Sequence, residues 1–220
     1  MIHVLEKNPL FKQLSSADVE HLIACLKPEV RTYQAGETIF MSHERLQAFG
    51  IVIAGTIELL KDNFYGHETL IQTMGPAASF GEAVALKPDS LTRVRAVSKT
   101  MSSIAFFNMA RFLSQCATPC RQHQTLQRNL LEMLAGKLVD LHQKIDLITQ
   151  PTIRDKLLDF LHQEQIKHQS NTFTLALSRQ RLADTLNVNR SALGRILKTL
   201  QEEGVLRVER NTFTIVSRNR

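Results

Sequence analysis

SRQRLADTLNVNRSALGRILKTLQEEG, from Ser178 to Gly204, is the stretch that decides how the rest of this chain is interpreted. Two short helical patterns meet there at Asn187-Val188. Ser178 is placed to cap the first helix and Asn189 the second, because short polar side chains at a helix start accept a hydrogen bond from an exposed backbone N–H. The spacing therefore predicts a helix-turn-helix that ends before Gly204.

The second of these helices has one apolar and one polar face. Its apolar positions recur at helical spacing and are Ala192, Leu193, Ile196, Leu197 and Leu200. Its outward positions are Arg190, Ser191, Gly194, Arg195 and Lys198. Arginine at a helix start and again five residues later is typical of a helix that enters the major groove of DNA.

Positive charge is concentrated in the same part of the chain. The net charge is +6, and residues 151–220 hold 12 Lys and Arg against 7 Asp and Glu, whereas residues 1–150 hold 15 against 14. Neutralisation of DNA phosphates requires such an excess of cations. A solvated basic surface has the same composition, so charge alone leaves both interpretations open.

Composition restricts the class of protein. A length of 220 residues with 43% apolar content indicates a globular protein of more than one domain. No apolar run approaches the roughly 18 residues of a membrane span, and the N-terminus lacks signal-peptide features, so we expect a cytoplasmic protein without a membrane partner. Cys25, Cys116 and Cys120 include no Cys-x-x-Cys pair, which argues against a disulfide framework or structural zinc.

The first half of the chain has the pattern of short β-strands. Before it, residues 1–26 have the apolar spacing of short helices. From Val30 on, the runs VRTY, TIFM, FGIVIAG, TIELLK, ETLIQTM, RVRAVSKT and SSIAFF are separated by turn residues, with a hairpin tip predicted at Asn63–His67. Closely spaced strands favour an antiparallel barrel or roll. We therefore predict a β-roll domain over residues 1–107.

A long helical pattern follows, from about Asn108 for some forty residues. Apolar residues spaced 3 and 4 apart form a seam that one helix cannot bury: Leu131, Leu134, Leu138, Leu141, Ile145 and Ile148. A second stripe of Leu126, Leu130 and Met133 is available to pack on the β-roll, so the seam is predicted to pair with a second copy of the chain. The alternative packs the seam itself on the β-roll. Because Pro151 disfavours helix before it, residues 108–150 are predicted to be a dimerisation helix and hinge.

Residues 151–220 form the third predicted segment. A helix over residues 153–163, a polar stretch KHQSNT and a short strand TLAL lead into the helix-turn-helix. Beyond Gly204, VLRV and FTIV flank a turn and are predicted to pair as a hairpin. The expected fold class is therefore α+β, with an N-terminal antiparallel β-roll, a long dimerisation helix and a C-terminal winged helix-turn-helix.

In this order the parts resemble the catabolite activator protein and fumarate-nitrate regulator (Crp/Fnr) family of bacterial transcription regulators. The resemblance rests on the stretch quoted first and on shorter matches at LFKQLS (Leu10–Ser15), AGETIF (Ala35–Phe40), IAGTIEL (Ile53–Leu59) and SFGE (Ser79–Glu82). It implies a homodimeric DNA-binding regulator rather than an enzyme, with a cyclic nucleotide-binding-like domain. Its implied partners are a palindromic double-stranded operator, a small-molecule effector that the sequence does not identify, and RNA polymerase.

The resemblance also implies roles for single residues at the DNA. The family's two recognition-helix arginines, which contact guanine and backbone, fall on Arg190 and Arg195. The glutamate that accompanies the first arginine falls on Ser191, so looser base recognition is expected there. A role as helix cap is the alternative for Ser178. The implied DNA-binding residues are Ser178, Arg179, Gln180, Asn189, Arg190, Ser191, Gly194, Arg195 and Lys198.

For the sensor, the resemblance implies a pocket whose phosphate clamp is incomplete. Gly81 and Glu82 match the Gly-Glu pair of cyclic-nucleotide-binding members. The arginine-serine pair that holds the phosphate falls on Ser90 and Leu91, and Arg93 or Arg95 substitutes for it only if its strand face points inward. The implied effector pocket consists of Gly81, Glu82, Ser90, Leu91, Arg93, Leu141 and His142. Since the bidentate phosphate contact is missing, the effector is not expected to be cyclic AMP.

Other sensing chemistries leave alternatives open, and the cofactor stays unknown. An iron–sulfur cluster needs about four thiolates and is not expected. Cys116 and Cys120, one helical turn apart, are candidates for a thiol switch or for small buried side chains. Haem is unsupported, because no ligand spacing connects His3, His43, His67 and His142.

Two further functions compete with an effector-controlled regulator. One is a DNA-binding regulator that needs no ligand. The other is a cupin-type metalloenzyme with His43, Glu44, His67 and Glu68 as ligands, which lacks the two histidines that such sites collect in one strand motif. We therefore expect no metal site at these four residues.

Overall fold

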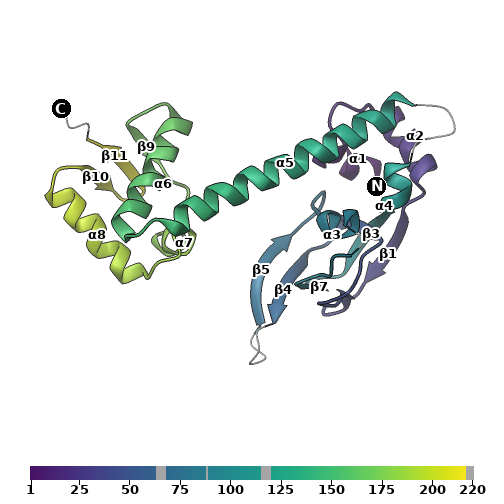
Figure 1. The fold of residues 1–220 in the computed structure, drawn as a ribbon, viewed down its shortest axis with the longest axis horizontal. Coiled ribbons are helices and arrows are strands. Elements are labelled where there is room, and N and C mark those ends of the chain that lie inside the picture. The colour runs from purple at the N-terminus through teal and green to yellow at the C-terminus, as the bar shows by residue number, and fades with distance from the viewer. Residues whose placement is uncertain (63–67, 88, 115–119, 217–220) are drawn as a thin grey trace. The chain divides into compact units, whose positions relative to one another are not determined.

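A computed structural model describes residues 1–62, 68–87, 89–114 and 120–216, except for the side chains of residues 143 and 144. The chain folds into two compact units, Met1–Gly136 and Lys137–Arg220. Helix α5, Arg121–Thr149, is continuous and contributes residues to both units (Figure 1). Because α5 belongs to both units, the division into segments 1–107, 108–150 and 151–220 stays a prediction.

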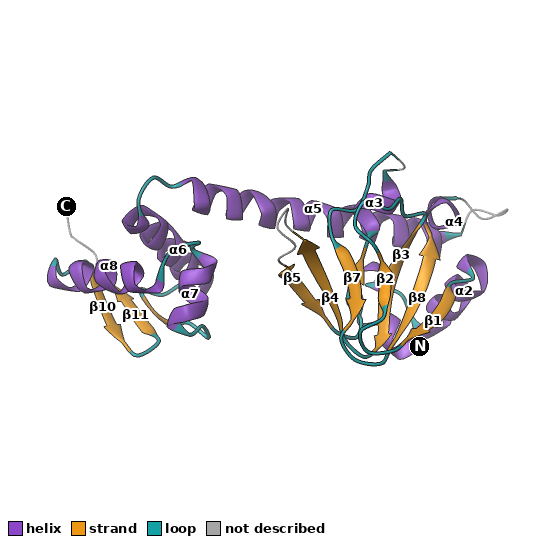
Figure 2. Cartoon of the chain, turned by 90° about the horizontal axis from the view of Figure 1, so that it is seen from below, coloured by secondary structure: helices purple, strands orange, loops and turns teal. Residues whose placement is uncertain are grey.

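Strands of the N-terminal unit form two antiparallel sheets, as the strand pattern predicted (Figure 2). The first has the order β1-β8-β3-β6 and the second the order β2-β7-β4-β5. The strand bounds are β1 Glu29–Tyr33, β2 Thr38–Phe40, β3 Ala48–Ala54, β4 Ile57–Asp62, β5 Glu68–Met74, β6 Ser79–Phe80, β7 Arg95–Ser98 and β8 Ser102–Asn108. The predicted hairpin tip, residues 63–67, lies outside the described residues.

Aromatic side chains fill the interior between the sheets. Phe80 is buried with its ring 6.0 Å from that of Phe40 and 6.4 Å from that of Phe106. Its ring also lies against Gly50, where a Cβ atom would come within 2.4 Å of Phe80 Cζ. Because no side chain fits at residue 50, the glycine in the third predicted strand is a packing requirement of Phe80.

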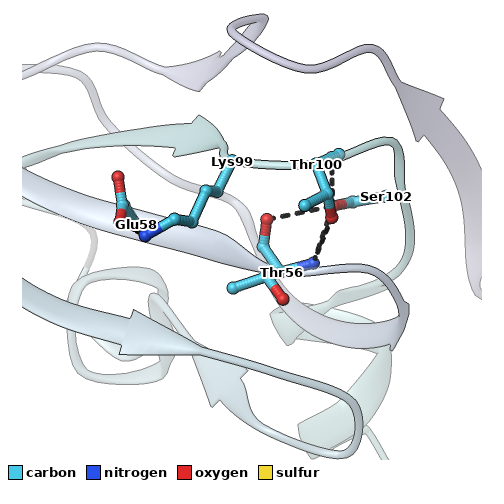
Figure 3. Close-up of polar contacts among 5 residues, drawn as sticks. All are labelled: Thr56, Glu58, Lys99, Thr100 and Ser102. Atoms are coloured by element: carbon cyan, nitrogen blue, oxygen red, sulfur yellow. Dashed lines mark hydrogen bonds and ion pairs between the residues drawn. The ribbon is translucent and has the colours of Figure 1, made fainter.

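The IAGTIEL match corresponds to a turn that touches a second turn (Figure 3). The Thr56 N–H donates to Thr100 Oγ1 at 3.0 Å and to Ser102 Oγ at 3.1 Å, and Lys99 pairs with Glu58 at 2.5 Å. A Cβ atom on Gly55, whose φ is +82°, would lie 2.4 Å from the Met101 carbonyl oxygen. The two turns thus close one end of the roll.

Helices of the N-terminal unit lie before and after the strands. Their bounds are α1 Ile2–Leu5, the 3-10 helix η1 Pro9–Phe11, α2 Ser16–Leu26, α3 Glu82–Leu86 and α4 Met109–Leu113. Helix α2 starts with a capping box, in which Ser15 and Asp18 bond each other's backbone N–H groups. These bonds and one from Gln122 lower the pKa of Asp18 to about 2.

The prediction of one helix from Asn108 onward was wrong. Asn108 instead caps the short helix α4, because its side chain accepts from the Arg111 N–H, and α5 begins only at Arg121. Within α5, Leu126 and Leu130 are buried in the N-terminal core and Met133 packs against it, which confirms the second stripe. Leu134 also packs against this core, so this seam position is partly covered by the chain's own β-roll.

The C-terminal unit is a winged helix with a three-stranded sheet of order β10-β11-β9. Its elements are α6 Ile153–His168, β9 Thr172–Thr174, α7 Arg179–Thr185, α8 Arg190–Glu202, β10 Leu206–Glu209 and β11 Thr212–Ile215. Two predictions were wrong here. Helix α6 continues to His168, and the strand before α7 is TFT rather than TLAL, because Phe173 pairs with Phe213 and their rings stack at 6.3 Å.

Candidate nucleic-acid interface and sensor residues

Helix α8 has the two faces that its sequence predicted. Asn189 caps it, with Oδ1 accepting from the Ser191 N–H at 2.8 Å. Leu193, Leu197 and Leu200 are buried in the C-terminal core, while Ala192 and Ile196 are half-buried. The outward set is exposed and consists of Arg190, Ser191, Gly194, Arg195 and Lys198. An exposed cationic helix face can contact phosphates and base edges.

The hairpin of β10 and β11, residues 206–215, is the wing of the winged helix. A groove of about 300 Å³ lies between α8 and this wing. Arg179, Arg190 and Lys198 supply cations to its lining, and Leu193 and Val208 supply apolar surface. Gly194 lies in the same lining, and a Cβ atom there would meet no neighbour within 4 Å. The groove therefore adds Arg179, from the start of α7, to Arg190 and Lys198 of the exposed face of α8.

Ser191 is less available for base contacts than its exposure implies. Its Oγ donates to Asn189 Oδ1 at 2.7 Å, which uses its only hydrogen. The hydroxyl retains acceptor capacity alone in this arrangement. Because Asn189 occupies the Ser191 hydrogen, Ser191 can only accept a hydrogen bond from a neighbouring base.

Arg179 contacts the wing, which sequence reasoning missed. Its guanidinium lies 4.9 Å from the Phe213 ring centre and donates to the Arg210 carbonyl oxygen at 2.5 Å. Burial lowers the pKa of Arg179, although the group stays charged. Arg179 therefore connects the start of α7 to the turn between β10 and β11.

Neighbouring residues at the start of α7 also have partners within the unit. Ser178 Oγ accepts from the Arg181 N–H at 3.2 Å, which confirms the capping alternative for Ser178. Gln180 donates to Asp184 at 2.8 Å. Arg207 and Arg210 on the wing are exposed cations that the predicted set lacked. The sequence could have indicated both residues, because two arginines lie three positions apart at the predicted hairpin turn.

The sensor motif, Gly81 and Glu82, is packed against neighbouring side chains. Gly81 has a φ of +84° and precedes α3, and a Cβ atom there would lie 3.0 Å from Leu46 Cδ1. Glu82 is only 4% exposed and accepts a hydrogen bond from the Ser79 hydroxyl. The Gly-Glu match is therefore a turn followed by a buried carboxylate, which is held by Ser79 of the preceding strand β6.

The predicted substitutes for a phosphate clamp, Arg93 and Arg95, differ in their surroundings. Arg95 forms ion pairs with Asp62 and Glu68 of the neighbouring hairpin strands, and Arg93 is exposed. Among the other predicted pocket residues, Ser90 is half-buried, while Leu91, Leu141 and His142 are exposed. Arg95 is thus already paired with two carboxylates, and a part for Arg93 or Arg95 in a phosphate clamp stays a prediction.

A cleft of about 620 Å³ opens beside this motif and was not predicted. Its apolar lining includes Leu46, Phe80 and Phe106. Its charged lining has the cations Lys27, Arg31, Arg45 and Arg111 and the carboxylates Glu29 and Glu44. Phe80 directly precedes Gly81, so the cleft adjoins the predicted effector pocket. Apolar surface beside four cations and two carboxylates can accept a ligand that has an apolar body and an anionic group.

The remaining cofactor candidates are the cysteines and the histidines. Cys120 Sγ accepts from the His123 N–H at 3.4 Å and lies 3.5 Å from His123 Nδ1. Cys116 and His67 lie outside the described residues, so the thiol switch stays a prediction. Within residues 1–62, 68–87, 89–114 and 120–216, no three His, Cys, Asp or Glu side chains are arranged to hold a metal ion. None of the helices described is long and apolar enough to cross a membrane.

Comparisons with known proteins match both units. Residues 30–118 match the model of the cyclic nucleotide-binding domain, and residues 155–220 match the model of the Crp-like helix-turn-helix domain. The cyclic AMP receptor protein of Thermus thermophilus is 25% identical over 220 residues, which cover 96% of this chain and 94% of the relative. The cAMP-activated global transcriptional regulator Vfr of Pseudomonas aeruginosa is 23% identical over 194 residues, or 84% and 88% of the two chains.

A solved structure supports the same fold. The crystal structure of the Thermus thermophilus catabolite activator protein superimposes with a TM-score of 0.58 at 23% identity. The match covers 95% of this chain and 94% of that chain. The order of roll, long helix and winged helix is therefore shared along nearly the whole length.

Proposed function

The chain belongs to the Crp/Fnr family of transcription regulators, and on this basis we propose that it acts as a homodimer on a palindromic operator under control of its β-roll. The observation that carries the proposal is the exposed face of α8, with Arg190, Arg195 and Lys198 beside the cationic groove. We propose that Arg190 reads one guanine per half-site and that Arg195 contacts the backbone.

The described geometry refines the proposed DNA contacts. Ser191 donates to Asn189, so it contributes at most an acceptor to the adjacent base. Ser178 and Arg179 have partners inside the unit and are proposed to support the interface rather than to read bases. Arg207 and Arg210 are proposed as additional phosphate contacts from the wing, since both are exposed cations.

Pairing of two chains is proposed along the second half of α5. Leu138, Leu141, Ile145 and Ile148 are all exposed there, although large apolar side chains in a row are rarely left in water by a monomer. Their spacing of 3 and 4 is that of a coiled-coil seam. A dimer also supplies two recognition helices, which is what two half-sites about one helical turn apart require.

A paired substitution on α5 tests the dimer. Leu138 and Val139 are adjacent, apolar and 53% and 54% exposed, but only Leu138 belongs to the seam. Leu138→Arg should yield monomers by sedimentation velocity and lose operator affinity, whereas Val139→Arg should remain dimeric and bind. Equal behaviour of the two variants would refute the seam.

The effector is proposed to be a small molecule or a redox signal other than cyclic AMP. Two relatives are named for cyclic AMP, but here Ser90 and Leu91 stand at the clamp positions and Arg95 is paired with carboxylates. Control by a ligand requires that it bind one arrangement of the protein more tightly than the other. A regulator that needs no ligand stays the alternative.

Operator binding by the purified chain distinguishes these possibilities. Affinity is measured by fluorescence anisotropy without additive and with cyclic AMP, an apolar carboxylate such as phenylacetate, haem, or hydrogen peroxide. A change with one of the last three supports an effector other than cyclic AMP. A response to cyclic AMP alone refutes the assignment, and full affinity unaffected by any additive favours the ligand-independent regulator.

A further inference from the structure

The N-terminal segment Asn8–Lys12 makes hydrogen bonds to two other parts of the N-terminal unit. One is the loop of residues 75–78, which leads through β6 to Gly81 and Glu82. The other is the first half of helix α5. Asn8 and Asn129 are 1% and 5% exposed, and each makes side-chain hydrogen bonds to backbone groups far away in the sequence.

Asn8 holds the loop end of this segment. Its Nδ2 donates to the Ala77 carbonyl oxygen at 2.8 Å, and its Oδ1 accepts from the Leu10 N–H at 2.8 Å. Ala77 has a φ of +67°, a left-handed conformation that costs a non-glycine residue free energy and persists when its surroundings hold it. Backbone bonds between Val52 and residues 77 and 78 hold the loop from the opposite side.

Asn129 holds the helix end. Its Nδ2 donates to the Leu10 carbonyl oxygen at 2.9 Å and to the Lys12 carbonyl oxygen at 2.8 Å, so both amide hydrogens are used. The peptide units of Leu10 thus bond Asn8 through the N–H and Asn129 through the carbonyl. Leu10 and Phe11 are buried in the N-terminal core, which makes the segment a rigid connector.

Strand β6, which follows the loop, also contacts α5 at a second point. Ser79, two residues beyond Ala77, has its Oγ 3.8 Å from Met133 Sδ and donates its hydrogen to Glu82. Met133 lies one helical turn from Asn129, so both connections end on the same stretch of α5. A displacement of the Gly81–Glu82 turn would therefore disturb contacts at two positions of α5, Asn129 and Met133, which lie one helical turn apart.

We propose that Asn8 and Asn129 are positioning residues that couple the loop of residues 75–78, which leads to the Gly81–Glu82 turn, to the first half of α5. Coupling of this kind requires that a change at one end alter the free energy of the other. The inference rests on the proposed role of the β-roll as sensor for its biological meaning. The mechanical connection itself is measurable without effector or DNA.

Hydrogen exchange of the full-length chain, followed by mass spectrometry, tests the coupling from both ends. In Asn8→Ser the serine retains the cap to the Leu10 N–H but cannot reach Ala77. We expect exchange to rise about fivefold or more both in the loop and in α5 near Asn129, as loss of one buried hydrogen bond implies. Asn129→Ser should raise exchange at the Ala77 and Ala78 amides, which its side chain does not contact.

Two controls separate this result from general destabilisation. Asn108→Ser makes the same chemical change at the exposed cap of α4 and should leave the loop and α5 unchanged. Amides of Ile51 and Ala105, central in the β3–β8 ladder, report global opening. If Asn129→Ser does not fold, Asn129→Asp, which keeps the side-chain shape and removes both donated hydrogens, supplies the same test.

Exchange that rises only next to each replaced side chain, or in step with Ile51 and Ala105, would overturn the coupling. Operator affinity is measured on the same variants. If operator binding fails for the wild-type chain while remote exchange changes as expected, the proposed function is wrong and the connector stands. Unchanged remote exchange with intact operator binding would mean that the connector is wrong and the proposed function stands.

Discussion

Helices α8 and α3 both carry residues that match the family's motifs, but these residues differ in their exposure. On α8 the matched arginines are exposed, while on α3 Gly81 is confined beside Leu46 and Glu82 is buried against Ser79. Side chains directed at an external partner contribute little to folding, whereas side chains embedded in packing are part of the core.

This difference predicts which property each substitution changes. Replacing exposed residues of α8 should alter DNA binding and leave stability unchanged. Replacing residues around α3 should alter stability first. Substitutions at Phe80, Arg190, Arg179 and Asp18 test this contrast, in order of decreasing expected effect.

The largest effect is expected at Phe80, next to the sensor motif. Phe80→Ala empties the space between Phe40, Phe106 and Gly50 and should destabilise the roll by about 3–5 kcal/mol. Thermal unfolding by circular dichroism measures the loss. Leu70→Ala on the exposed face of β5 is the control and should change stability by no more than about 0.5 kcal/mol. Equal losses would mean that the aromatic interior does not hold the roll together.

Arg190 on α8 should show the reverse behaviour. Arg190→Ala removes an exposed side chain, so the unfolding temperature stays unchanged, while discrimination between guanine and other bases falls by about 1–3 kcal/mol. Competition between operators that differ at one base pair measures this. Lys198→Ala, the control, should weaken all operators equally. Unchanged discrimination in Arg190→Ala would remove Arg190 from base recognition.

Arg179 tests whether a motif residue in the C-terminal unit can also belong to the packing. Arg179→Ala loses the contact over Phe213, worth about 0.5–1 kcal/mol, and the bond to the Arg210 carbonyl. We expect faster hydrogen exchange in β10 and β11 and weaker operator binding with an unchanged salt dependence. A salt slope lowered by about 1 would instead identify Arg179 as a phosphate contact.

The smallest effect is expected at the capping box of α2. The pKa of Asp18 is lowered to about 2 from 3.8, so its contribution to stability is present above pH 3.8 and is lost as the pH falls towards 2. The difference in unfolding temperature between wild type and Asp18→Asn should therefore shrink between pH 4 and pH 2. A difference that stays constant over this range would show that ionised Asp18 does not stabilise the cap.

Local features were predicted well, and the reason is that they depend on near neighbours. Asn189 and Ser178 cap helices through N–H groups two and three residues away, and the buried face of α8 follows from helical spacing. The strands of the roll likewise follow from short apolar runs between turns. The break between α4 and α5 was missed, since the apolar pattern alone does not show that α4 ends at Leu113 and that Ser114 adopts an extended backbone conformation.

The sequence by itself thus determined the order of β-roll, long helix and winged helix, and the cationic face of α8. Only the tertiary structure decided the partners of the remaining candidates: Arg179 bonds a carbonyl 31 residues away, Asn8 one 69 residues away, and Asn129 one 119 residues away. Helical and strand periodicity relate residues within a few positions, so they predict which face a side chain occupies. Periodicity does not specify which distant backbone group bonds to that side chain, because chain topology and core packing bring such groups together.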